Sequence, residues 1–159
     1  DPSKVLYGGK SDPATLRIQP TLLVDVTGDD PVMQEEIFGP LLPILPYDSI
    51  DEAFEFIQAR PHPLALYLFS EDRALQNRVL STLSFGGGCI NDTIIHLATS
   101  RMGFGGVGDS GMGSYHGKKS FDTFSHEKSI VNKSTLIDLP MRYAPYSPLT
   151  GRLLRLFLR

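Results

Sequence analysis

The feature that most constrains the fold is an amphipathic segment with a start signal and a stop signal, residues 49–63. Ser49, with Glu52 three residues later, has the pattern of a capping box, and Pro61 marks the far end. Between these signals, apolar side chains recur at i, i+3, i+4 and i+7, which places them on one face of a helix. The pattern predicts a helix that buries this face, formed by Ile50, Ala53, Phe54 and Ile57.

Strand-like segments precede and follow this helix. Residues 21–26 (TLLVDV) predict a strand, and residues 41–47 (LLPILPY) predict an edge strand, because proline lacks the N–H of a ladder. Residues 64–69 (LALYLF) and 93–98 (TIIHLA) predict further strands. Between them, Ser70 is expected to cap a second helix, whose apolar face carries Leu75, Val79 and Leu83. This alternation indicates an α/β fold with a mostly parallel sheet flanked by helices.

The glycine-rich residues 105–119 (GGVGDSGMGSYHGKK) match G-x-G-x-x-G at Gly106, Gly108 and Gly111. A dinucleotide fingerprint needs a strand that runs directly into the first glycine and a helix that opens at the last. Residues 99–104 separate the predicted strand from this loop, and Gly113 interrupts a helix after Gly111. A P-loop would need glycine at Met112. We therefore predict a tight backbone turn, followed by a short helix within residues 114–125.

Composition excludes several classes of partner. The chain has 159 residues and a formal net charge of −3, so no basic surface for nucleic acid is expected. Its apolar runs are too short to span a membrane, and a membrane partner is not expected. The lone cysteine, Cys89, is incompatible with an intrachain disulfide framework and is typical of a reducing, cytoplasmic setting. No metal site is expected.

Two long motifs resemble those of the aldehyde dehydrogenase superfamily, and their amino-acid sequences are most similar to its class 3 branch. The first is PVMQEEIFGP, residues 31–40, with a strand before it and IDEAFEFI after it. The second is GFGGVGDSGMGSYHGKKSFDTFSHEKSIV, residues 103–131. The resemblance extends from about Tyr7 to Val131. It implies NAD or NADP as cofactor and a small-molecule aldehyde as substrate, which the enzyme would oxidise to a carboxylic acid.

The resemblance assigns a cofactor role to two residues of the first motif. It implies that the carboxylate of Glu36 accepts hydrogen bonds from both hydroxyls of the nicotinamide ribose, and that Phe38 lies against the nicotinamide. Without the resemblance, Glu36 would be interpreted as a solvated surface acid and Phe38 as a core aromatic.

The second motif is expected to lie near the mouth of the aldehyde tunnel. The resemblance implies that Phe104 faces the substrate and that Ile94 and His96 line the same pocket. A histidine in an apolar strand is more often a satisfied core residue, and that interpretation stays open for His96. Gly103 departs from the family, which usually has proline before Phe-Gly-Gly.

The family's chemistry requires a nucleophilic cysteine in Asn-Gln-Gly-Gln-x-Cys and a general base in Glu-Leu-Gly-Gly. Neither motif occurs in this sequence. Cys89 stands in another context, with no histidine beside it in sequence, and is interpreted as a small buried hydrophobe. The chain starts at Asp1 without an initiator methionine, which fits either processing or a piece of a longer protein. The resemblance implies the C-terminal portion of the enzyme, inactive by itself.

Three regions are expected within this portion. Residues 1–125 would form the C-terminal part of the catalytic domain, which packs against the remainder of the parent enzyme. Residues 126–134 would form an oligomerisation strand near Ile130 that joins the sheet of a second subunit in a homodimer. Residues 135–159 would form a tail with a short amphipathic helix. Leu149, Leu153 and Phe157 would lie on one side of this helix, and Arg152, Arg155 and Arg159 would be among its remaining residues. The alternative hypothesis is a stand-alone, non-catalytic assembly or binding module with the same fold.

Overall fold

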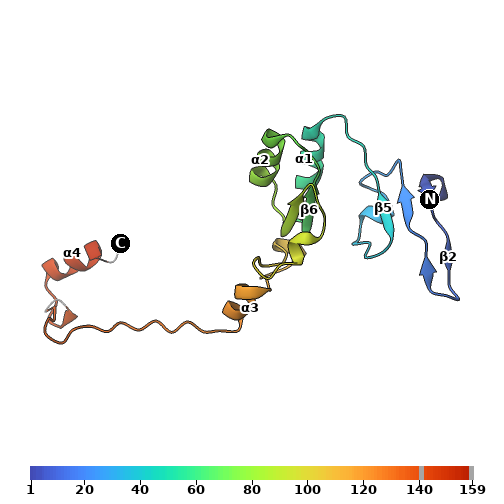
Figure 1. Ribbon diagram of the computed structural model, residues 1–159. Helices are drawn as coiled ribbons and strands as arrows, with labels where there is room; N and C mark the ends of the chain where they lie inside the picture. The colour runs from blue at the N-terminus through green and yellow to red at the C-terminus, as the bar shows by residue number, and fades with distance from the viewer. Residues whose placement is uncertain (140–141, 158–159) are drawn as a thin grey trace. The chain divides into compact units, whose positions relative to one another are not determined.

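The computed structural model describes residues 1–139 and 142–157. It divides into two units, residues 1–123 and 124–159, which are described separately (Figure 1). The first unit contains all the strands of the described residues and three of their α-helices, whereas the described residues of the second unit form one α-helix.

The first part of the chain forms a three-stranded sheet in the order β1-β4-β5. β1 runs antiparallel to β4, and β4 runs parallel to β5, with Thr21 opposite Leu41. β5 is therefore an edge strand, as its prolines predicted. A separate hairpin is formed by β2 and β3. The elements of this part are η1 (Pro2–Lys4), β1 (Val5–Tyr7), β2 (Ser11–Asp12), β3 (Arg17–Ile18), β4 (Thr21–Leu23), η2 (Pro31–Met33) and β5 (Leu41–Pro43).

The strand predicted for residues 21–26 is shorter than expected, because β4 ends at Leu23. Asp25 has a φ of 53°, a left-handed conformation that cannot continue an extended ladder. The chain instead leaves the sheet and returns to β5 through residues 24–40. This crossover contains η2 and the acidic motif of residues 34–40.

The helix predicted from its capping signals is confirmed as α1 (Ile50–Gln58). The Ser49 hydroxyl accepts a hydrogen bond from the N–H of Glu52 at 3.3 Å. The reciprocal bond is displaced by one residue, because the Glu52 carboxylate accepts from the N–H of Asp48 at 3.1 Å. Phe54 on the apolar face is 4 % exposed and belongs to the core.

A strand–helix–strand unit follows, formed by β6 (Ala65–Leu68), α2 (Arg73–Thr82) and β7 (Gly87–Ile90). β6 and β7 are parallel, with Tyr67 opposite Cys89. Figure 1 shows α1 and α2 beside this pair of strands. The core consists of Phe54, Val79 and Leu83, with partly buried Leu66 and Leu68 of β6 packed against it.

Two local predictions in this unit are wrong. Asp72, not Ser70, is the N-cap of α2, because its carboxylate accepts from the N–H of Ala74 at 2.8 Å, while the Ser70 hydroxyl accepts from Asp72. The last strand is β7 rather than residues 93–98, which contain the short helix η3 (Ile95–Leu97). Within residues 1–123, two of the four strand pairings are parallel, and the strands fall into three small sheets rather than one.

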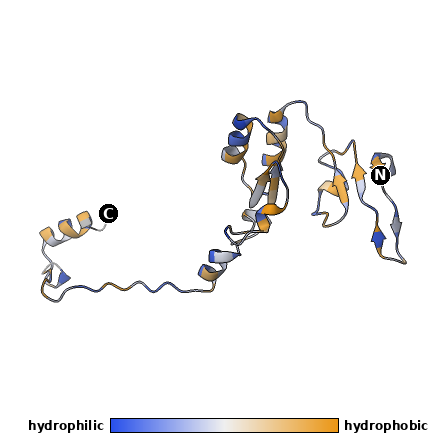
Figure 2. Ribbon diagram, viewed as in Figure 1, coloured by the Kyte–Doolittle hydropathy of each residue, from blue (hydrophilic) through white to orange (hydrophobic). Residues whose placement is uncertain are grey.

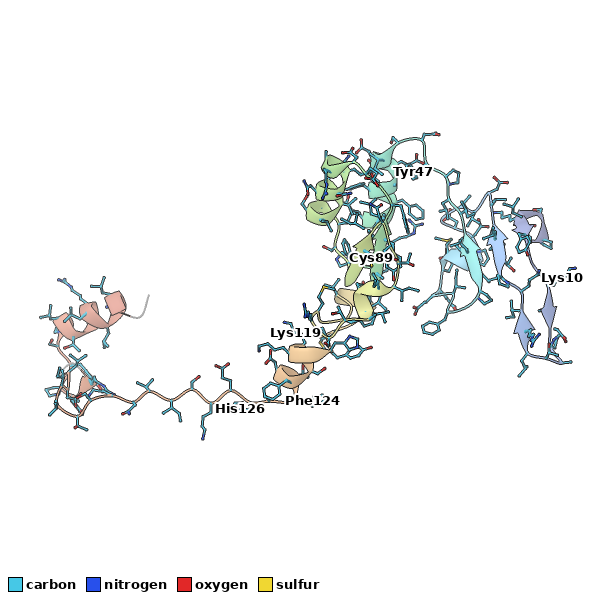
Figure 3. All side chains as sticks on the ribbon, viewed as in Figure 1. Lys10, Tyr47, Cys89, Lys119, Phe124 and His126 are labelled. Atoms are coloured by element: carbon cyan, nitrogen blue, oxygen red, sulfur yellow. The ribbon has the colours of Figure 1, made fainter. Side chains whose placement is uncertain are left out.

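The glycine loop contains η4 (Gly108–Ser110), and the predicted short helix follows it as α3 (Gly117–Thr123). In the second unit, residues 126–134 belong to no strand of the described chain, and Ile130 and Val131 are exposed. Figure 3 shows this segment extended around His126. The strand predicted near Ile130 therefore stays a prediction, since a ladder requires a partner strand.

The C-terminal residues form α4 (Pro148–Phe157), which carries hydrophobic residues along its length (Figure 2). Leu149 and Leu153 share one side, whereas the side chain of Phe157 and all of Arg159 lie outside the described residues. None of the helices in residues 1–139 and 142–157 combines the length and the apolar character that a membrane crossing requires.

Candidate functional site

The crossover of residues 24–40 is fixed near its start by a charged contact with Lys4, the last residue of η1. Nζ of Lys4, just before β1, lies 2.7 and 2.6 Å from the two carboxylate oxygens of Asp30. The same carboxylate accepts a hydrogen bond from the N–H of Thr27 at 2.6 Å. The Lys4 ammonium and the Thr27 N–H together lower the pKa of Asp30 to about 2.

A second interaction holds the turn that leads to the acidic motif. Nε2 of Gln34 donates to the carbonyl oxygens of Gly28, at 3.0 Å, and of Asp30, at 3.4 Å. The side chain of Gln34 thereby ties the end of η2 to the beginning of the crossover. Residues 35–39 follow directly after this hydrogen-bonded turn.

The two predicted cofactor residues both project from the surface of this crossover. Glu36 is exposed, and its carboxylate has no hydrogen bond or ion pair within the described part of the chain. Phe38 is 92 % exposed and has a φ of 45°, a conformation that L-residues with large side chains rarely adopt. In this chain Phe38 is therefore not a core aromatic. A carboxylate and an aromatic ring two residues apart offer hydrogen-bond acceptors and a stacking surface to a ligand.

A second group of predicted residues lies on the face of the β6–β7 pair opposite the core. Leu66 and Leu68 point to the core, so the alternation of a strand directs Tyr67, and its partner Cys89 on β7, to the other face. The imidazole of His96 covers this face. Its centroid lies 5.7 Å from the ring of Tyr67 and 5.6 Å from the ring of Phe104.

His96 is 9 % exposed, and its two ring nitrogens have different surroundings. Nδ1 lies 3.6 Å from Sγ of Cys89, within hydrogen-bond distance for sulfur, whereas Nε2 is buried without a hydrogen-bond partner among the described residues. Gly87 makes room for the ring, because a Cβ there would lie 3.1 Å from Cδ2 of His96. His96 is therefore buried, and its Nε2 has no hydrogen-bond partner among the described residues.

Sequence reasoning missed the contact between Cys89 and His96. Cys89 is half-buried rather than fully buried, and a histidine seven residues later lies beside it. The turn that returns the chain contains Asn91 and Ile94, both with positive φ, which no pattern of apolar residues indicates. Figure 3 labels Cys89 on β7.

Phe104 is positioned by the backbone of the glycine loop. Its N–H and C=O exchange hydrogen bonds with Tyr115, at 2.9 and 3.0 Å. Within the loop, a Cβ on Gly105 would overlap the backbone of Gly113, and one on Gly106 would overlap the carbonyl of Ser110. The loop is thus folded on itself, in agreement with a backbone turn.

Ile94 and Gly103 stand at the edges of this region. Ile94 has a φ of 63° and is 59 % exposed, and the aromatic contacts that join His96 to Phe104 do not include it. A Cβ on Gly103 would lie 2.9 Å from Cγ of Lys119 and 3.0 Å from Oγ of Ser114, so the site has little space for a side chain.

The predicted residues thus fall into two groups within residues 1–123. Glu36 and Phe38 lie on the crossover, and His96 and Phe104 lie on the outer face of β6 and β7. No hydrogen bond or ion pair between described residues joins the groups. The described ranges also contain no cluster of three or more His, Cys, Asp or Glu that could hold a metal ion.

Residues 2–130 match the model of the aldehyde dehydrogenase family. The 4,4'-diaponeurosporen-aldehyde dehydrogenase of Staphylococcus aureus is 59 % identical over 142 residues, which is 89 % of this chain and 31 % of that protein. The aldehyde dehydrogenase family 3 member H1 of Arabidopsis thaliana is 51 % identical over 152 residues, 96 % of this chain and 31 % of that protein. The chain spans about a third of the length of these curated relatives.

Solved structures of aldehyde dehydrogenases are also similar to this chain. The substrate-bound state of Staphylococcus aureus AldH superposes with a TM-score of 0.88 at 54 % identity, covering 99 % of this chain and 34 % of that one. A betaine aldehyde dehydrogenase variant from the same organism, solved in complex with NAD+, has a TM-score of 0.65 at 27 % identity and covers 76 % of this chain and 25 % of that one.

Proposed function

Because this chain belongs to the aldehyde dehydrogenase family and has class 3 relatives, we propose that it is the C-terminal segment of an NAD(P)-dependent enzyme that oxidises aldehydes to carboxylic acids. The observation that carries the proposal is the exposed pair Glu36 and Phe38 on a braced crossover, within the span that the family model matches. When bound, the nicotinamide cofactor would accept the hydride that the aldehyde loses.

Glu36 is proposed to hold the nicotinamide ribose. A carboxylate has acceptor positions for two hydroxyls, and charge-assisted hydrogen bonds are short and directional. Its exposure, and its lack of a charged partner in the described chain, support this role, because no existing contact would have to break. Asp30 and Gln34 would act indirectly by fixing the start of the crossover.

Phe38 is proposed to contact the nicotinamide and to limit where its ring lies. A left-handed backbone conformation is costly for a residue with a large side chain, and such conformations cluster at ligand-binding sites. Positioning of this kind matters because a reaction between two bound groups tolerates little misplacement. The 92 % exposure of Phe38 is the observation that supports this role.

His96, Phe104 and Ile94 are proposed to form part of the aldehyde pocket. The first two are in contact, and the unpartnered Nε2 of His96 supplies a polar atom among aromatic rings. An apolar pocket with few polar groups is typical of small-molecule sites. Ile94 would add apolar surface at the rim, where its exposed side chain is available.

The nucleophile and the general base are proposed to come from outside this chain, because the motifs that carry them in the family do not occur in it. Residues 1–125 would complete the catalytic domain. Residues 126–134 would pair with a second subunit in a homodimer, and residues 135–159 would form the tail. The chain alone would be inactive.

The deciding experiment begins with the coding DNA upstream of Asp1. If the frame continues and encodes Asn-Gln-Gly-Gln-x-Cys and Glu-Leu-Gly-Gly, its complete product is assayed with benzaldehyde and with NAD or NADP. Glu36→Gln should raise the KM for the cofactor at least about tenfold, because a hydrogen bond to a charged group contributes about 1.5–3 kcal/mol. Glu35→Gln, a neighbouring exposed carboxylate, is the matched control and should leave the KM unchanged.

Two results would contradict the proposal. Equal KM values for Glu36→Gln and Glu35→Gln would show that Glu36 does not contact the nicotinamide ribose. Aldehyde oxidation by the 159-residue chain alone, at an ordinary enzyme rate, would show that the chemistry does not need the missing motifs. A start codon immediately before Asp1 would favour the stand-alone assembly module.

A further inference from the structure

The sulfur of Cys89 and the imidazole of His96 form a pair, and the proposed aldehyde pocket assigns no role to the sulfur. Sγ lies 3.6 Å from Nδ1, and this contact is the only hydrogen bond of either group within the described chain. The ring itself is held by three further neighbours. Tyr67 and Phe104 contact it at 5.7 and 5.6 Å between centroids, and Gly87, which lacks a Cβ, lies beside Cδ2 and Nε2 of the ring.

The position of the protons follows from counting donors and acceptors. A neutral imidazole has one N–H donor and one bare nitrogen acceptor, and a thiol has one weak S–H donor. If the thiol donates to Nδ1, the ring proton is on Nε2, and only that N–H lacks a partner. If instead Nδ1 donates to sulfur, both the S–H and the bare Nε2 lack partners. The first arrangement leaves fewer buried polar groups unsatisfied and is therefore favoured.

We propose that Cys89 is a positioning residue that holds neutral His96 as the tautomer with its proton on Nε2. His96 then carries a hydrogen-bond donor, and not an acceptor, at Nε2, which is buried beside Gly87 of β7. Under the proposed function, on which this step rests, the fixed tautomer keeps the ring of His96 in one position at the aldehyde pocket.

The tautomer can be measured directly by two-bond 1H–15N NMR correlations of histidine side chains in the full 17.5 kDa chain. We expect a pyridine-type 15N shift for Nδ1 and a pyrrole-type shift for Nε2 of His96. Cys89→Ala should convert this pattern to a mixture of tautomers, and Cys89→Ser, which keeps a hydroxyl donor, should retain it. The signals of two other histidines, His62 and His126, serve as internal controls.

A proton on Nδ1, protons on both nitrogens, or a pattern that Cys89→Ala leaves unchanged would each overturn the inference. These readouts need neither substrate nor cofactor, so they are separate from the test of Glu36 and aldehyde oxidation. In the complete enzyme, Cys89→Ala should lower kcat/KM for the aldehyde by about tenfold at most, as expected for one lost hydrogen bond. Cys89→Ser should restore most of the loss. A serine variant as impaired as the alanine variant would contradict a role through the donor.

Discussion

Phe104 and Tyr115 close the glycine loop through a pair of backbone hydrogen bonds, 2.9 and 3.0 Å long. Their rings also meet edge to face, with centroids 5.9 Å apart. The ten residues between them fold without a hydrophobic core of their own, and the loop relies on close approach of one backbone to another. This arrangement places Phe104 against His96.

Gly106→Ala should destabilise the chain, because its new Cβ would overlap the backbone carbonyl of Ser110, which cannot move without opening the loop. We expect a loss of about 1–3 kcal/mol in the free energy of unfolding, measured by urea denaturation. Gly39→Ala is the control, because a Cβ there meets its nearest backbone atom at an ordinary 3.5 Å. Equal stability of the two variants would show that the loop has more space than its geometry indicates.

Acid should weaken the contacts by which the Asp30 carboxylate holds the start of the crossover. Its folded pKa of about 2 lies below the ordinary value of 3.8, so its contribution to stability is complete at neutral pH and is lost as the pH falls from about 4 to about 2. Asp30→Asn should therefore flatten the pH dependence of unfolding in that range. Asp29→Asn, which removes an exposed neighbouring carboxylate, is the control. The same acid sensitivity in all three proteins would mean that the contact of Asp30 with Lys4 is not the cause.

Phe38→Gly should separate stability from cofactor binding. Glycine accepts a φ of 45° without steric cost, and the exposed phenyl ring contributes little packing. The relief of about 1–2 kcal/mol from the left-handed conformation is partly offset by the greater freedom of glycine in the unfolded chain. We expect thermal stability equal to or above that of the natural chain, with weaker NAD(P) binding in the complete enzyme. A large loss of stability would instead assign Phe38 to packing.

Ile130→Pro should weaken self-association if residues 126–134 pair with a second subunit. Proline removes the N–H of a ladder and is tolerated only at positions that donate no hydrogen bond. Sedimentation of the complete enzyme should shift from dimer toward monomer. Ile130→Thr keeps both the N–H and the branched Cβ, and it should remain dimeric. A dimeric proline variant would place the interface elsewhere.

The parts of the fold that were predictable have their signals close together in the sequence. The start, the apolar face and the stop of α1 all lie within residues 49–63. The cap of α2 was assigned two residues early, because Ser70 and Asp72 are both good capping residues and only the backbone geometry distinguishes them.

β7 was missed because it begins with glycines, which are poor strand formers. Its position depends on a distant contact. A Cβ on Gly88 would overlap the carbonyl of Leu66 on β6, so the absence of a side chain is what allows the two strands to pair as they do. The adjacent apolar run, residues 93–98, was a better strand by composition, but Ile94 turns the chain away with a φ of 63°. The contact between Cys89 and His96 follows from this turn.

The glycines at the start of β7 and in the loop have a consequence at the level of the gene. Added Cβ atoms on Gly86 and Gly105 would each overlap a backbone carbonyl, Gly105 in the first case and Gly113 in the second. Every missense codon at these positions encodes a residue with at least a Cβ, so no amino-acid replacement is mild on steric grounds. Silent changes alone should be neutral there, although the glycines themselves contribute no chemical group to the site.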